Sequence, residues 1–395
     1  MSKVLEGIRV LDFGRFIAGP FGATLLADMG ADVIRVERPG GEEDRTIGPY
    51  APNIDVGMRF MALARNKRCI TLNLQSPKGK EILAKLVKMS DVVLGNYPYG
   101  VMEDMGIDYK SLSQINPSII VSQVSGFGQE GPYARRTCFD MIGQAMSGNM
   151  SITGFPGNPP VKNNAPYVDY ATATFSALGI MFALYHRERT GQGQMVDVSL
   201  FQTAMTYMLV PLNEYITRGI VRKQIGNASY YNLSDAYLTK DGMVFIAIIG
   251  RYIWRRFAKA LGRPELTEDP RFSSDQLRAD NYDQIQPLIA QWMAQRTTDE
   301  VMKLMEEARV PCGQVFEYTR LADDPHVKHH KMLVEMDYPG AGKIPVHAPP
   351  IKLSKTPGGI RTRAPLLGEH NDEVYCGMLG YSSQDVAQFA KEGII

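Results

Sequence analysis

The first 130 residues alternate short apolar segments with amphipathic ones, and this alternation constrains the fold more than any other feature of the sequence. The pattern predicts strands over residues 8–13, 32–37, 69–74, 91–96 and 118–124, and helices over residues 20–29 and 76–89. Near-continuous runs of Val, Ile and Leu are typical of parallel strands buried on both faces. The fold class is therefore α/β, with a ligand site expected at the carboxyl ends of the strands.

The remaining sequence predicts one more long helix, from Asp169 to about residue 190, followed by a strand over 195–200. Near Tyr230 the pattern changes to a strand over 243–249, a helix over 252–261 and charged helices up to residue 308. We expect these segments to form a smaller α+β domain over residues 225–325. The stretch 324–365 is rich in Pro, Gly and His and is expected to be a long connection, and 382–391 a terminal helix.

Charge and cysteine content exclude several classes of function. Lys and Arg number 43 against 42 Asp and Glu, so a net charge of +1 gives no reason to expect a nucleic acid or an anionic membrane as partner. The four cysteines lie far apart, which predicts neither a disulfide framework nor a metal site. The first residues lack the apolar core of a signal peptide, so we expect a cytoplasmic protein with reduced thiols.

Two segments could carry a site, and each has a simpler alternative. The turn over residues 14–20 follows the first strand but lacks the GxGxxG spacing of a dinucleotide-binding fold, which argues against an NAD enzyme. Asp169 precedes a helix rich in small residues, where Asp is among the commonest N-caps. The same position suits a catalytic carboxylate, because a helix N-terminus stabilises its ionised form.

Short motifs spread over nearly the whole chain resemble one family, the class III CoA-transferases, also called the CaiB/BaiF family. These motifs are LEGIRVLDF at 5–13, AGP at 18–20, GADVIRVE at 30–37, RNKR at 65–68, SGFG at 125–128, TGQGQMVDVS at 190–199, PCG at 311–313, LSKTP at 353–357, GEHN at 368–371 and LGYS at 379–382. Together they are specific for the superfamily but not for a substrate.

The resemblance implies an interlocked homodimer in which both chain ends build a Rossmann-like large domain with a parallel sheet. Residues 1–200 would be the first part of this domain, 201–224 a linker, 225–325 the small domain, and 326–395 a return linker with the C-terminal part of the large domain. No permanently bound cofactor is implied. Coenzyme A and acyl-CoA would be substrates, together with an organic acid.

The resemblance also implies site residues. Asp169 matches the family's nucleophile, which attacks an acyl-CoA thioester and passes through a mixed anhydride and an aspartyl-CoA thioester. Positions that line the bound CoA correspond to Ala18, Arg38, Leu72, Asn96, Tyr97, Phe139 and Asp140. Many members carry an Arg where this chain has Asp104, so we expect Arg135 or Arg136 to replace that phosphate contact.

Two alternative functions remain open from the sequence. The same superfamily contains α-methylacyl-CoA racemases, which need an acid and a base on opposite faces of the α-carbon. Their His-Asp motif reads Phe139-Asp140 here, and His186 lies 17 residues after Asp169 on the expected helix, or roughly 25 Å away. The second alternative is that the protein binds CoA without catalysis, in which case Asp169 would only cap a helix.

The acceptor acid is predicted from the small domain alone. The oxalate-directed members carry a run of glycines where this chain reads IIGRY at 248–252. This difference, with SYYN at 229–232, favours the carnitine-type branch and an organic acid larger than oxalate, with Arg251 as a possible contact for its carboxylate.

Overall fold

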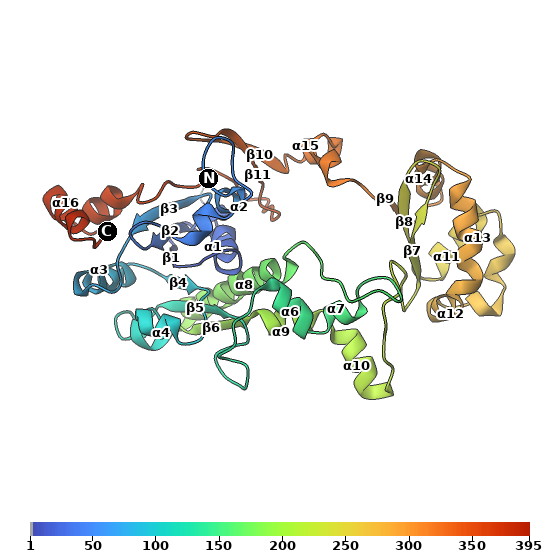
Figure 1. Ribbon diagram of the computed structural model, residues 1–395, viewed down its shortest axis with the longest axis horizontal. Helices are drawn as coiled ribbons and strands as arrows, with labels where there is room; N and C mark the ends of the chain where they lie inside the picture. The colour runs from blue at the N-terminus through green and yellow to red at the C-terminus, as the bar shows by residue number, and fades with distance from the viewer. Residues whose placement is uncertain (1–2) are drawn as a thin grey trace. The chain divides into compact units, whose positions relative to one another are not determined.

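The computed structural model describes residues 3–395 and divides the chain into two compact units (Figure 1). Unit 1 consists of Met1–Asn149, Lys162–Thr217 and His326–Ile395, and unit 2 of Met150–Val161 and Arg218–Pro325. Segments from both ends of the chain therefore belong to unit 1. The resemblance predicted this feature of the large domain.

Unit 1 is built on a six-stranded parallel sheet with the order β3-β2-β1-β4-β5-β6. The strands are β1 (Arg9–Asp12), β2 (Asp32–Glu37), β3 (Lys67–Thr71), β4 (Val92–Gly95), β5 (Ile120–Ser125) and β6 (Met195–Ser199). The strand order reverses between β1 and β4, and in open α/β sheets ligands bind at such a reversal. The fold class predicted from the alternation is confirmed.

Helices cover both faces of this sheet. One face packs against α1 (Ala18–Asp28) and α8 (Tyr167–Thr190), through apolar residues such as Leu26, Val33, Val92 and Ile180. The other face packs against α3 (Pro77–Lys88), whose N-cap Ser76 accepts a hydrogen bond from the Gly79 amide. Shorter helices of unit 1 are α2 (Met58–Leu63), α4 (Val101–Met105), α5 (Tyr109–Ser113), α6 (Asp140–Met146) and α9 (Leu200–Thr206). The short α7 (Asn149–Ile152) and α10 (Leu209–Arg218) lie where the chain passes between the units.

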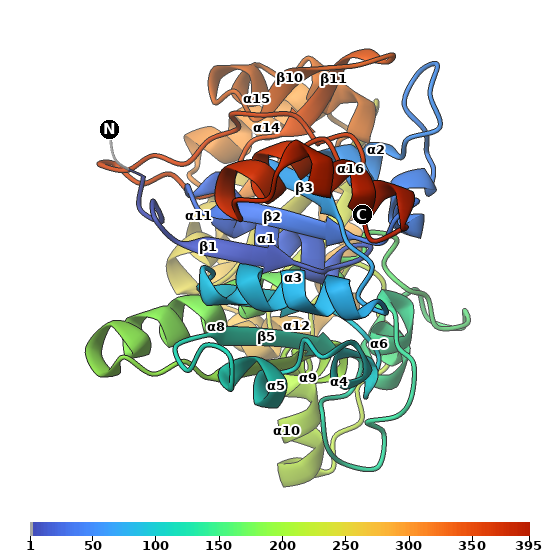
Figure 2. The ribbon, with the colours of Figure 1, turned by 90° about the vertical axis from the view of Figure 1, so that its left-hand side faces the viewer.

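The C-terminal segment covers the β3 edge of the sheet. Tyr375, in the π-helix Glu373–Met378, donates a hydrogen bond to the Thr71 carbonyl at 2.6 Å, and the His370 amide donates to the Cys69 carbonyl at 3.0 Å. The terminal helix α16 (Ser383–Lys391) contributes Val386 and Phe389 to the same core as α3 (Figure 2). An exposed edge strand is thereby avoided.

Helix α8 is the one segment among residues 3–395 that is long and apolar enough to cross a membrane by length and composition. It has 24 residues, and half of its apolar window is buried inside the protein. The buried half packs on α1 and on β5 and β6. The long helix predicted from Asp169 is therefore a core helix over that half.

The stretch 324–365 was predicted to be a long connection, and this prediction is wrong in part. It contains α15 (Pro325–His329) and an antiparallel hairpin of β10 (Leu333–Tyr338) and β11 (Gly342–His347). Tyr338 and Ile344 of the hairpin pack on Phe60 and Met61. Charged residues alternate with apolar ones in β10, which is a strand pattern that the prediction overlooked. Pro345 interrupts the pattern of β11, so the second strand is less conspicuous in the sequence.

Unit 2 contains a three-stranded antiparallel sheet of β7 (Leu233–Leu238), β8 (Met243–Ile248) and β9 (Cys312–Gln314). Its helices are α11 (Arg251–Ala260), α12 (Asp275–Asp280), α13 (Tyr282–Ala294) and α14 (Thr298–Glu307). Trp254, Phe257, Ile289 and Val301 belong to its core. This is the small α+β domain that the change of pattern near Tyr230 predicted.

The unit boundaries differ from the expected ranges at two places. Residues 150–161 were expected in the large domain but belong to unit 2, where the Gly226 amide donates a hydrogen bond to the Gly154 carbonyl. Residues 201–217 were expected to be a linker but belong to unit 1, most of them in α9 and α10. Both segments lie near crossings between the units.

Candidate active site

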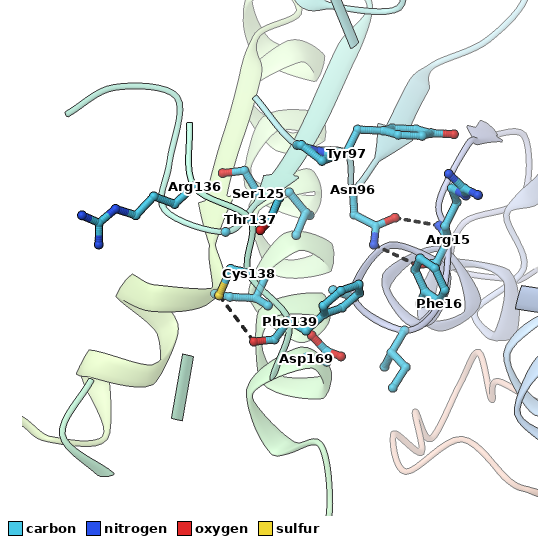
Figure 3. Close-up of a pocket in the computed structure, with 16 residues that line it drawn as sticks. Arg15, Phe16, Asn96, Tyr97, Ser125, Arg136, Thr137, Cys138, Phe139 and Asp169 are labelled. Atoms are coloured by element: carbon cyan, nitrogen blue, oxygen red, sulfur yellow. Dashed lines mark hydrogen bonds between the residues drawn. The ribbon is translucent and has the colours of Figure 1, made fainter. Parts of the chain in front are cut away.

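Two adjoining cavities open at the carboxyl ends of the unit 1 strands. The inner cavity, of about 210 Å³, is lined by residues that include Phe16, Ala18, Asn96, Phe139 and Asp169 (Figure 3). The outer cavity, of about 500 Å³, is lined by residues that include Phe13, Val36, Arg38, Leu72 and Val101. Arg15, Tyr97 and Pro98 line both cavities, so a long ligand can extend from one into the other.

The structure brings most of the predicted site residues together at these cavities. Asp169, Ala18, Asn96, Tyr97 and Phe139 line the inner cavity, and Arg38, Leu72 and Tyr97 line the outer one. Asp140 lines neither cavity, because its carboxylate is turned towards the start of α8. Arg251 belongs to unit 2, and its contact with a substrate stays a prediction.

Asp169 is not the N-cap of α8. The helix begins at Tyr167, so Asp169 is its third residue, and the cap residue Pro166 has no side-chain acceptor. Asp140 caps this end of the helix instead: its Oδ2 accepts hydrogen bonds from the amides of Val168 at 2.8 Å and Asp169 at 3.2 Å. The alternative that explained Asp169 as a cap is therefore wrong.

The Asp169 carboxylate is buried, with 8% of the residue exposed, and lines the inner cavity. Among residues 3–395 it accepts no hydrogen bond. Burial raises the pKa of Asp169 to about 7; the negative charge of Asp140 adds to this effect and the charge of Arg59 opposes it. A carboxylate with this pKa is more basic than an ordinary Asp and is poised to react near neutral pH.

The β1–α1 loop forms the junction of the two cavities. The Asn96 side chain holds Arg15 by both backbone groups, accepting from its amide at 2.7 Å and donating to its carbonyl at 2.8 Å (Figure 3). Phe16 follows with a φ of 61°, a conformation that non-glycine residues rarely adopt. Its ring contacts Phe139 edge to face, with 5.7 Å between centroids, and the two rings form one apolar wall of the inner cavity.

Cations are distributed unequally between the two cavities. Arg38 lines the outer cavity and donates to the Gly41 carbonyl at 2.9 Å, and Arg15 is paired with Glu42 at 3.0 Å. Arg136 lines the inner cavity, whereas Arg135 stacks on Tyr99 and lines neither. Neither Arg135 nor Arg136 lines the outer cavity, so the expected replacement for an Arg at position 104 gains no support from the structure and stays a prediction. Arg15 lies at the junction instead.

Sequence reasoning missed Cys138 as a lining residue. Its thiol contacts the Phe139 carbonyl at 3.4 Å, and the residue lines the inner cavity with Asp169 (Figure 3). Burial, together with the negative charge of Asp169, raises the pKa of Cys138 to about 11 and keeps it a neutral thiol. A single cysteine beside the Phe139-Asp140 pair gave no signal of this role, because only the fold brings it to Asp169.

Comparisons with known proteins identify the family of the chain. The family described as CoA-transferase family III matches residues 5–371. A succinyl-CoA–D-citramalate CoA-transferase of Chloroflexus aurantiacus is 38% identical over the full length of this chain and 98% of its own, and a formyl-CoA:oxalate CoA-transferase of Streptomyces coelicolor is 34% identical over the full length of both.

Two solved structures are similar to this chain over nearly its whole length. A CaiB/BaiF family protein from Brucella suis is 31% identical with a TM-score of 0.82, covering 95% of this chain and 100% of that one. The protein Rv3272 of Mycobacterium tuberculosis is 28% identical with a TM-score of 0.83, covering 94% of this chain and 98% of that one. The chain therefore belongs to CoA-transferase family III, and its full-length likeness to enzymes of that name makes it a class III CoA-transferase.

Proposed function

We propose that the protein transfers CoA from a dicarboxylic acyl-CoA of the succinyl-CoA type to a second organic acid, with Asp169 as the covalent nucleophile. The observation that carries this proposal is the environment of Asp169: a buried carboxylate that lines a cavity, accepts no hydrogen bond from residues 3–395 and does not cap its helix. Such a group costs stability, so it calls for a functional explanation.

The proposed reaction needs no proton transfer at any step. An Asp169 oxygen attacks the thioester carbonyl, the C–S bond breaks, and a mixed anhydride and CoA thiolate result. The thiolate attacks Cγ of Asp169 and expels the donor acid as a carboxylate. The acceptor carboxylate then attacks the aspartyl-CoA thioester, and the thiolate attacks the acceptor carbonyl of the new anhydride, which releases acyl-CoA and the Asp169 carboxylate.

The two cavities suit the shape and charge of an acyl-CoA. The outer cavity offers Arg38, at the end of β2, to a phosphate, and it is large enough for part of a nucleotide. The inner cavity is smaller and mostly apolar, with Phe16, Phe139 and Leu200 around Asp169. We assign the nucleotide to the outer cavity and the thioester to the inner one, where limited access protects an anhydride from water.

The racemase alternative needs a second acid or base that faces the α-carbon. Phe139 stands where the racemases have a His, and Asp140 lines neither cavity. Cys138 lines the inner cavity, but its raised pKa keeps it a neutral thiol, which is a poor base for the α-proton. These features favour transfer over racemisation. A purely CoA-binding role would leave the buried Asp169 carboxylate without an explanation.

The substrate class follows the full-length relatives. They are named for succinyl-CoA with D-citramalate or L-malate and for formyl-CoA with oxalate, all of them acceptors with two carboxylates. The carnitine-type branch was inferred from nine residues of unit 2, a much narrower basis than identity along the whole chain. We therefore propose a four- or five-carbon dicarboxylic acid, which agrees with the expected acid larger than oxalate.

We also propose that the functional molecule is the interlocked homodimer implied by the resemblance. Helix α8 carries large apolar residues on the surface not covered by unit 1: Phe175, Leu178, Met181, Phe182 and Tyr185 are 36–65% exposed. Exposed apolar side chains spaced three or four residues apart on one helix are typical of a protein interface. A second copy of the chain is the occupant that we propose.

Covalent trapping tests the proposed nucleophile. Purified protein is incubated with succinyl-CoA, treated with hydroxylamine, digested and examined by mass spectrometry. We expect a hydroxamate on the peptide that contains Asp169, formed only when acyl-CoA is present. The Asp169→Asn protein should give no adduct and no transfer to D-citramalate or L-malate. Wild-type turnover by Asp169→Asn would rule out the mechanism.

A further inference from the structure

Asp140 is a second buried carboxylate beside the nucleophile, and the reaction written above does not use it. It begins α6, is 6% exposed, and accepts hydrogen bonds from the amides of Val168 and Asp169 through Oδ2. Its Oδ1 accepts from the Gln144 side-chain amide at 2.5 Å. Both carboxylate oxygens are therefore fixed, one by the first turn of α8 and the other by α6.

Gln144 extends this arrangement to the segment that leads into α8. The side chain is 1% exposed, its Oε1 accepts from the Asn163 amide at 2.8 Å, and its Nε2 donates to the Asn163 carbonyl at 3.2 Å. Asn163 lies one residue after Lys162, where the chain returns to unit 1. One side chain of α6 thus holds both the returning segment and the carboxylate that binds the start of α8.

We propose that Asp140 is a positioning residue for the nucleophile: held by Gln144, it fixes the first turn of α8 so that the Asp169 carboxylate projects into the inner cavity, and it places a second negative charge next to that carboxylate. This inference rests on the proposed role of Asp169. Asp140 itself touches neither substrate nor the reacting atoms, because it lines neither cavity.

The charge of Asp140 has a consequence distinct from its hydrogen bonds. A neutral Asn could accept the same two amide hydrogens, so the helix end does not by itself require a carboxylate. A like charge at this distance disfavours ionisation of Asp169, and burial acts in the same direction. The result is a more basic carboxylate that attacks more readily once ionised but requires a higher pH to ionise.

Other charged and titratable groups also act on Asp169. Arg59 on α2 lowers its pKa and is exposed to solvent. Cys138 and Tyr170 are neutral neighbours whose own pKa values the charge of Asp169 raises. The pKa of Tyr167, on the same helix turn, is raised by burial and by the charge of Asp140 rather than by that of Asp169. Asp140 is therefore the neighbouring negative charge that a substitution can remove.

Two substitutions separate the bonds that Asp140 makes to the start of α8 from its charge. Asp140→Asn keeps an acceptor for the two amides of α8 but removes the charge and the bond from Gln144, so the acid limb of kcat/KM for acyl-CoA should move down by about 0.5 pH unit or more. Asp140→Ala removes the charge and every acceptor, and kcat at pH 8 should fall by at least about tenfold. Asp197→Asn is the matched control: this carboxylate accepts an amide hydrogen from Gln129 but lies outside the inner cavity, and its pH profile should be unchanged.

The outcomes distinguish this inference from the proposed function. If Asp169 carries the hydroxylamine adduct but folded Asp140→Asn keeps the wild-type acid limb, or Asp140→Ala keeps wild-type kcat, the positioning role is wrong and the nucleophile stands. If Asp169 never carries an adduct, the proposed function itself fails. Should Asp140→Asn not fold, Gln144→Met replaces it: loss of kcat without a downward shift of the acid limb supports the role, and wild-type kcat overturns it.

Discussion

The side-chain amide of Asn96 bonds both backbone groups of Arg15, with distances of 2.7 Å to the amide and 2.8 Å to the carbonyl. The same amide lies against Gly19, where an added Cβ would come within 2.5 Å of Asn96 Oδ1. Asn96 therefore fixes the β1–α1 loop at the junction of the two cavities. Asn96 was expected to line the bound CoA. Both polar atoms of its side chain already bond the Arg15 backbone, so we expect Asn96 to act on CoA binding by holding this loop.

Asn96→Asp tests this role, because the carboxylate can still accept from the Arg15 amide but cannot donate to the Arg15 carbonyl. We expect a severalfold rise in KM for acyl-CoA and a loss of roughly 1–2 kcal/mol in the free energy of unfolding. Steady-state kinetics and urea denaturation measure the two effects. Asn73→Asp, which adds a carboxylate to the lining of the outer cavity, measures how much of the rise in KM an added charge alone causes. Wild-type KM in Asn96→Asp would show that the loop does not depend on this pair.

Arg38 is expected to bind a phosphate of CoA, because it lines the outer cavity and is exposed to solvent. Arg38→Gln should raise KM for acyl-CoA about tenfold or more with a smaller change in kcat. Arg135→Gln, a cation that lines neither cavity, should leave KM unchanged. Equal affinity of the wild type for CoA and 3′-dephospho-CoA, measured by calorimetry, would exclude the 3′-phosphate as the partner of Arg38.

The buried ion pair of Lys67 and Asp12 should contribute to the stability of unit 1. Lys67 Nζ lies 2.7 Å from Asp12 Oδ2 with both side chains inaccessible, and it also donates to the Pro20 carbonyl. Lys67→Met leaves a buried carboxylate without its cation, which costs about 3–5 kcal/mol. Lys78→Met breaks the exposed pair with Glu81 and should cost less than about 1 kcal/mol. Urea denaturation of the two variants compares these costs, and similar values would contradict the prediction.

The apolar surface of α8 predicts the oligomeric state. Light scattering should give a mass near twice the chain mass of 43.9 kDa, unchanged on dilution to nanomolar concentration. Phe182 is 65% exposed, so Phe182→Arg should leave the core of unit 1 intact but yield smaller or aggregated species. Lys110→Glu, an exposed charge change on α5, is the control. A stable wild-type monomer would contradict the proposal.

The sequence predicted the parallel sheet because its strands are continuous apolar runs, whose signal does not depend on tertiary context. β3 begins two residues earlier and ends three residues earlier than predicted, because Lys67 belongs to the strand although it is charged. Its burial is explained by its partners Asp12 and the Pro20 carbonyl, which the sequence pattern does not show. Asp169 was recognised from its motif, but the cap was assigned to the wrong residue. Asp140 is 29 residues away in sequence, so local patterns could not predict its bonds to α8.

The buried nucleophile Asp169 should lower the stability of the protein at neutral and higher pH. The pKa of Asp169 is raised to about 7 by burial and by Asp140, whereas in the unfolded chain it is near 3.8. A raised carboxyl pKa means that the folded state holds the proton more tightly, so folding is penalised as pH rises from about 4 and the full penalty is reached above about 7.

Asp169→Asn removes this penalty and should be more stable than the wild type at pH 8, by at most about 4 kcal/mol at 1.36 kcal/mol per pKa unit. The difference should shrink as the pH falls and approach zero below about pH 3, where the wild-type carboxyl is protonated in both states. Thermal unfolding of the two proteins across this pH range, at one protein concentration, measures the difference. Asp197→Asn is the control: this carboxylate is exposed and accepts a hydrogen bond from the Gln129 amide, so its substitution should change stability much less. A less stable Asp169→Asn at pH 8 would mean that the carboxylate is not strained by burial, and the argument for its reactivity would lose its physical basis.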